Sequence, residues 1–103
     1  MANTTDFISL LIRAATQIED LGDFGRRKLL ETSVATISEL SQAAGVSQDY
    51  STKDAMAKFE ALSARVALGY AHDAEVRIAL LDAARVIREL RVVLDGSSEG
   101  KLE

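Results

Sequence analysis

The sequence has 103 residues, of which 48% are hydrophobic, and a formal net charge of −4. These values fit one domain with its own apolar core, and the negative charge weighs against nucleic acid, whose phosphates require a concentrated basic surface. The lack of cysteine and the single histidine exclude disulfide frameworks, thiolate nucleophiles and the usual Cys/His zinc sites. We therefore expect no metal and no other cofactor.

The first twenty residues lack a basic stretch, and polar residues such as Arg13 and Gln17 interrupt their apolar run. This pattern is not that of a signal peptide or a membrane-spanning helix. We expect a cytoplasmic protein that does not enter the membrane.

Local preference favours helix almost everywhere, because proline is absent and alanine is frequent. Apolar residues recur at steps of three and four in each of four segments, and no segment alternates with a period of two. The predicted helices cover residues 4–21, 24–44, 52–69 and 73–95. Because short links favour antiparallel neighbours, we predict a four-helix antiparallel bundle in one domain, residues 1–95, followed by a flexible tail of residues 96–103.

The stretch around residues 68 to 77, LGYAHDAEVR, decides whether the last two helices are separate. Gly69 suits a helix end, Asp73 is predicted to be the N-cap of the next helix, and Glu75 suits its first turn. The alternative is that helices 3 and 4 are fused into one long helix of about 65 Å in a helical dimer. We favour the break.

The fourth predicted helix is apolar on more than one side. Its main line alternates steps of four and three and consists of Val76, Leu80, Ala83, Ile87, Leu90 and Leu94. A second line with the same spacing lies elsewhere on the cylinder and consists of Ile78, Leu81, Arg85, Arg88 and Val92. A helix with two such lines is either central in the bundle or part of an interface between chains, and the second line is our candidate interface.

Two other features suggest rival functions. An exposed His72 in mid-helix would resemble the phosphoacceptor of histidine-phosphotransfer domains, but Asp73 and Glu75 beside it would repel a phosphoryl group. Arg26, Arg27 and Lys28 stand at the start of a helix, where positive charge opposes the helix dipole. They are candidates for docking an acidic partner or, in a nucleic-acid-associated regulator, phosphates.

The leading hypothesis is a small non-enzymatic module for protein–protein interaction or self-association, with a homodimer as the first expected assembly. No residue is predicted to be catalytic, because the lone histidine has no nucleophile elbow beside it and the carboxylates lie on polar faces. The alternatives are the phosphotransfer module using His72 and the nucleic-acid-associated regulator using Arg26, Arg27 and Lys28.

Overall fold

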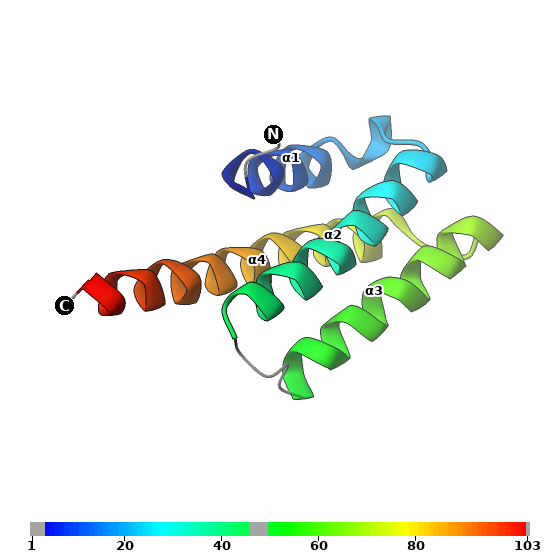
Figure 1. Cartoon of the computed structure of the whole chain (residues 1–103). Helices are drawn as coiled ribbons and strands as arrows, with labels where there is room; N and C mark the ends of the chain where they lie inside the picture. Colours follow the sequence, from blue (N-terminus) through cyan, green and yellow to red (C-terminus); the bar gives the residue numbers. More distant parts are fainter. Residues whose placement is uncertain (1–3, 46–49, 103) are drawn as a thin grey trace.

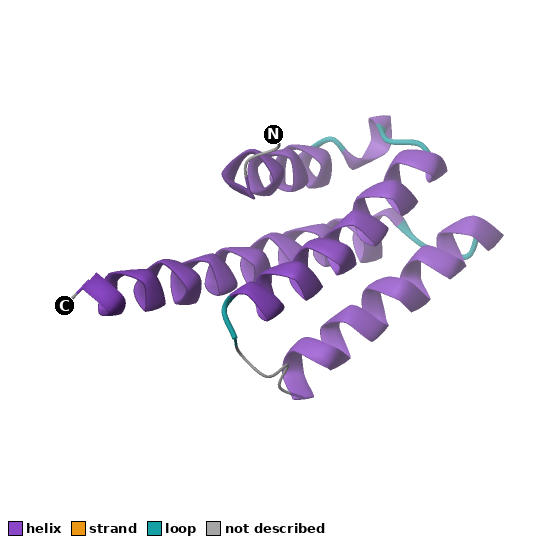
Figure 2. Ribbon diagram, viewed as in Figure 1, coloured by secondary structure: helices purple, strands orange, loops and turns teal. Residues whose placement is uncertain are grey.

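The computed structural model describes residues 4–45 and 50–102, and these residues form helices and short links without a strand (Figure 2). The described residues form four α-helices, which confirms the predicted all-α, four-helix bundle, and Figure 1 shows their arrangement. The predicted loop after the second helix falls partly on residues 46–49, which lie outside the described residues, as do residues 1–3 and 103. The elements in chain order are α1 (Thr4–Thr16), the 3₁₀ helix η1 (Ile18–Asp20), α2 (Asp23–Ala43), α3 (Tyr50–Leu68) and α4 (Asp73–Leu102).

Helix α4 lies at the centre of the arrangement. It packs extensively against α1 on one side and α2 on another, while α3 packs mainly against α2 and touches α4 only sparsely. Successive helices alternate in direction, so α2 and α4 run the same way and α3 diverges from α4 along its length (Figure 1). The bundle is therefore uneven, with a close α1–α4–α2 side and a looser α3–α4 side.

The core lies around α4. Every member of its predicted main line from Val76 to Leu90 is buried, which confirms that assignment, and Leu94 is half-buried. α1 and η1 contribute Leu11, Ala15 and Ile18, and α3 contributes Phe59, Leu62 and Val66. The buried apolar residues are Leu11, Ala15, Ile18, Leu29, Leu30, Ile37, Phe59, Leu62, Val66, Val76, Ala79, Leu80, Ala83, Ala84, Val86, Ile87 and Leu90.

The first helix is shorter than predicted. We expected one helix over residues 4–21, but α1 ends at Thr16, and Gln17 leaves the helical conformation with φ −109° and ψ 37° before η1 begins. Gly22 then precedes α2 instead of ending α1. The early end is stabilised from elsewhere in the chain, because Arg77 of α4 donates to the Ala15 carbonyl, which the end of α1 leaves without a helical partner.

The corner between α3 and α4 is real, so the alternative of one fused helix is wrong. Gly69 has φ +79°, a left-handed conformation that side-chain-bearing residues rarely adopt. The Tyr70 amide donates to the Arg65 carbonyl at 2.9 Å and the Gly69 amide to the Val66 carbonyl at 3.1 Å, the paired bonds of a Schellman helix end. The glycine therefore ends α3.

Helix α4 starts where the sequence predicts but with different roles for its first residues. The Val76 amide donates to the His72 carbonyl, so His72 occupies the N-cap position and Asp73 is the first helical residue. The prediction that Asp73 caps the helix is therefore wrong. At its other end α4 is helical to Leu102, seven residues beyond the predicted end at residue 95. Flexibility of residues 96–103 stays a prediction.

Candidate interaction surface

The outer face of α4 consists of the second line that the sequence singles out, and all five residues are exposed. Ile78 is 67% exposed, Leu81 43% and Val92 64%. Arg85 and Arg88 lie between them and are also exposed. One helix thus buries its main line in the core and leaves these three large apolar side chains, together with Val93, exposed.

The charges on and beside this face are balanced. Arg85 binds Asp82 at 2.6 Å and Glu89 at 3.0 Å, and these hydrogen-bonded carboxylates, Asp82 first, raise the pKa of Arg85 above its ordinary value. Arg88 supplies a second positive charge. Two acids and two arginines give this part of the surface no net charge, in a chain whose net charge is −4.

A groove of about 450 Å³ runs beside the outer face, between α3 and α4. It exists because α3 diverges from α4, and Ile78 belongs both to its wall and to the outer face of α4. The buried Phe59, Leu62 and Ala79 form an apolar floor. The whole lining consists of Lys58, Phe59, Ala61, Leu62, Arg65, Glu75, Ile78, Ala79 and Asp82.

The groove is closed at the corner by a polar contact. Arg65 of α3 binds both carboxylate oxygens of Glu75 on α4, at 2.7 and 2.8 Å, and Arg65 also donates to the Tyr70 carbonyl. The Glu75 carboxylate in turn accepts the His72 amide at 3.2 Å. The Arg65 hydrogen bond, followed by that of His72, lowers the pKa of Glu75 below its ordinary value of 4.5.

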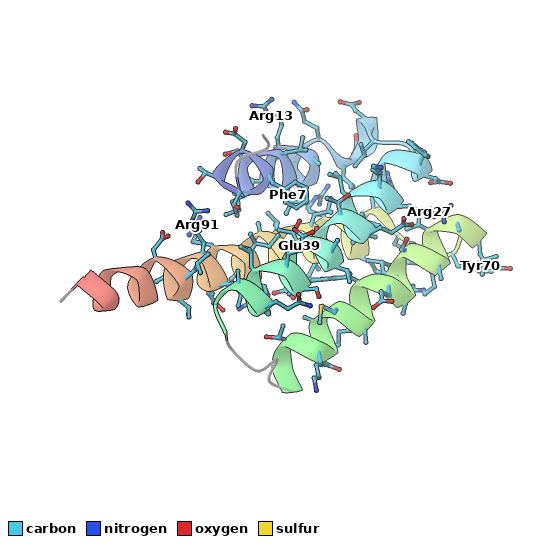
Figure 3. The ribbon with its side chains drawn as sticks, viewed as in Figure 1. Phe7, Arg13, Arg27, Glu39, Tyr70 and Arg91 are labelled. Carbon is cyan, nitrogen blue, oxygen red and sulfur yellow. The ribbon has the colours of Figure 1, made fainter. Side chains whose placement is uncertain are left out.

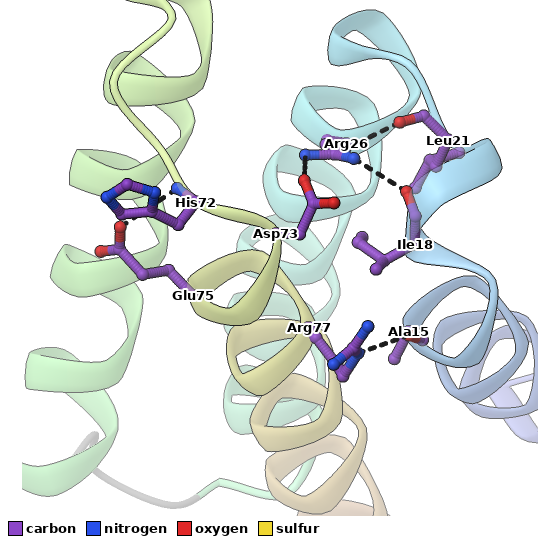
Figure 4. A network of polar contacts seen from close by, with 8 residues as sticks. All are labelled: Ala15, Ile18, Leu21, Arg26, His72, Asp73, Glu75 and Arg77. Carbon is purple, nitrogen blue, oxygen red and sulfur yellow. Dashed lines mark hydrogen bonds and ion pairs between the residues drawn. The ribbon is translucent and has the colours of Figure 1, made fainter.

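Arg26 does not join a docking patch. Its side chain is only 11% exposed and donates to the Leu21 carbonyl at 2.7 Å and the Ile18 carbonyl at 2.8 Å. It also binds Asp73 at 2.8 Å, so one guanidinium joins η1, α2 and α4 (Figure 4). The unfavourable position of this arginine near a helix start therefore has a structural reason. It donates to the Leu21 carbonyl and adds a second donor to the Ile18 carbonyl, which also accepts the Leu21 amide.

The other two predicted docking residues, Arg27 and Lys28, are exposed. Arg27 forms a long ion pair of 3.7 Å with Glu31 on its own helix, and Lys28 is exposed. Because Arg26 is turned inward, the predicted group of three cations supplies two surface charges. A separate side chain, that of Tyr70 after α3, points away from the bundle in Figure 3.

His72 is exposed, but it lies in the link before α4 and not within a helix. Its backbone serves the corner, with the amide bound to Glu75 and the carbonyl to Val76. The arrangement required for the phosphotransfer alternative, an exposed histidine in mid-helix, is therefore not the one observed.

Sequence reasoning missed the α3–α4 groove and the Arg65–Glu75 contact. Nothing in the spacing of the residues on the groove floor indicates that α3 diverges from α4. Arg65 and Glu75 were visible as opposite charges on either side of a predicted corner. That arrangement could have suggested the pair.

Comparison with protein-family models, curated proteins and solved structures finds no match to this chain. Among residues 4–45 and 50–102, none of the helices combines the length and apolar character needed to cross a membrane.

Proposed function

We propose that this chain is a small non-enzymatic helical module that binds other protein chains through the outer face of α4, and that it forms a homodimer through this face. The observation that carries this proposal is the exposure of Ile78, Leu81 and Val92 on α4, the helix that packs against both α1 and α2. Exposed apolar side chains that share one face and are bordered by polar residues are typical of interaction sites.

The charge distribution also supports association between two copies of this chain. Two copies of a chain with net charge −4 repel one another at most orientations. At the outer face of α4 the acids Asp82 and Glu89 are balanced by Arg85 and Arg88, so two copies can meet there without net repulsion.

The test is the molecular mass in solution, measured by light scattering over a range of concentrations, for the natural chain and for Leu81→Asp. We expect the natural chain to be a dimer and Leu81→Asp to be a folded monomer, because a charge in an apolar interface is left without water. Ala35→Asp, at an exposed position of α2, is the matched control and leaves the mass unchanged.

Val92→Asp, at a more exposed position of the same face, is an independent test of the same interface. A natural chain that stays monomeric at all concentrations contradicts the homodimer. A dimer that survives both aspartate variants contradicts the assignment of the outer face of α4.

A further inference from the structure

The structure assigns a specific occupant to the α3–α4 groove, and this inference rests on the proposed self-association. We propose that the groove receives the α3–α4 pair of a second copy, so that four helices, two from each chain, enclose the groove floors. The two-fold axis of this dimer runs parallel to the helices, which places α3 of each copy beside α4 of the other.

The first support is the charge of the two edges of the groove. The α3 edge is basic, with Lys58 and Arg65, whereas the α4 edge is acidic, with Glu75 and Asp82. An occupant that fits must therefore present an acidic edge to α3 and a basic edge to α4. A second copy does so when its α4 lies beside this α3 and its α3 beside this α4.

The second support is the register of these charges. Arg65 and Glu75 contact each other, so they lie at one level along the bundle. Two turns away, α3 has Lys58 and α4 has Asp82, which both line the groove. A two-fold axis parallel to the helices keeps each residue at its level, so Lys58 of one copy meets Asp82 of the other, and the reverse.

The third support is that, among the described residues, Lys58 and Asp82 pair only with residues of their own helices in the single chain. Lys58 pairs with Asp54 on its own helix at 3.3 Å, and Asp82 pairs with Arg85 on its own helix. Exposed pairs of this kind contribute little, so they can be exchanged for contacts across an interface. Between the charged edges, Ala61 and Ile78 offer one small and one large apolar side chain to the incoming helices.

The test uses two single variants, Lys58→Glu and Asp82→Lys. The dissociation constant of the dimer is measured for each. Each variant alone places like charges together at both symmetry-related contacts, so we expect its constant to rise about tenfold. Mixing the two variants creates a heterodimer in which one contact keeps the natural pair of Lys58 and Asp82, and the other has the same two charges exchanged. Both contacts then join opposite charges. We expect the mixture to regain the affinity of the natural chain.

The mixing step separates pairing between copies from closure of the groove within one copy. If Lys58 and Asp82 pair within one chain, the double variant recovers stability but mixing the single variants recovers nothing, and the inference is overturned. Lys53→Glu and Glu60→Lys, exposed on α3 away from the groove lining, make the same charge changes and leave the dissociation constant unchanged.

The outcomes also separate this inference from the proposal on which it rests. A natural dimer that Leu81→Asp dissociates, but that Lys58→Glu and Asp82→Lys leave intact, keeps the outer face of α4 as interface and overturns the groove arrangement. A natural chain that is monomeric at all concentrations contradicts both the groove arrangement and the proposed homodimer.

Discussion

The two sides of α4 both carry large apolar side chains but differ in their surroundings. On the inner side Leu80 is fully buried in the core, whereas its neighbour in sequence, Leu81, is 43% exposed on the outer side. The inner side is covered because α1 and α2 both pack against it, and the outer side is open because α3 diverges. Apolar spacing therefore indicates which sides of a helix can be buried, and the neighbouring helices decide which side stabilises the fold.

The polar contacts differ in the same way. On the inner side, the side chain of Arg26 is 11% exposed, donates to two carbonyls and pairs with Asp73. On the outer side, the side chain of Arg65 is 45% exposed and pairs with Glu75. Both arginines link α4 to a neighbouring helix. Arg26 is shielded from water over nearly all of its side chain and Arg65 over about half, so the two links differ in strength.

The largest expected effect comes from truncating the inner side. Leu80→Ala removes a fully buried side chain and leaves a cavity, so we expect the free energy of unfolding to fall by about 2–5 kcal/mol. Leu81→Ala, one residue away, should cost less than about 1 kcal/mol in the monomer. Urea denaturation of both variants measures the difference, and equal losses would contradict the contrast between the two sides.

A smaller effect is expected from the arginines. Arg26→Ala leaves the Leu21 carbonyl and the Asp73 carboxylate without this donor and the Ile18 carbonyl with only the Leu21 amide, so we expect a loss of about 1–3 kcal/mol in the free energy of unfolding. Arg65→Ala should cost less than about 1 kcal/mol, because its ion pair is half exposed. Arg26→Lys is the informative control. It keeps the charge but lacks the planar fork, so it should stay destabilised in the same denaturation experiment.

The smallest effect concerns acid stability at the outer side. The pKa of Glu75 is lower in the folded chain than its ordinary value of 4.5, so its contribution is complete above that value and is lost as pH falls through the lowered pKa. Glu75→Gln lacks this contribution. The difference in unfolding free energy between the natural chain and this variant should shrink on acidification, as followed by thermal unfolding. A constant difference would mean that Glu75 does not titrate differently in the folded state.

The sequence predicted the four helices because their apolar spacing is local information. Gly69 marked the α3–α4 corner correctly, since a left-handed residue at a helix end is a property of a few neighbouring residues. The end of α1 was missed because the contacts that stabilise it come from far away, such as Arg77 at the Ala15 carbonyl. Helix ends that depend on distant partners leave little trace in the local pattern.

The candidate surface was predicted in part. The exposed residues Ile78, Leu81 and Val92 follow from a second apolar line on a helix whose first line is already in the core. The groove beside them depends on how far α3 stands from α4, which is set by packing across three helices. The role of Arg26 was missed for the same reason. Its cluster with Arg27 and Lys28 is local, whereas its bond to Asp73 joins positions 47 residues apart.

The packing of the first helix against the last has a consequence for synthesis on the ribosome. The Arg77 contact to Ala15 spans 62 residues, and the Arg91 contact to Thr4 spans 87. The α2–α3 hairpin can form while translation continues, but the buried side of α1 has no cover until nearly the whole chain has emerged. Closing so long a segment is an entropic barrier, so docking of α1 onto α4 is expected to be the late step that limits the folding rate.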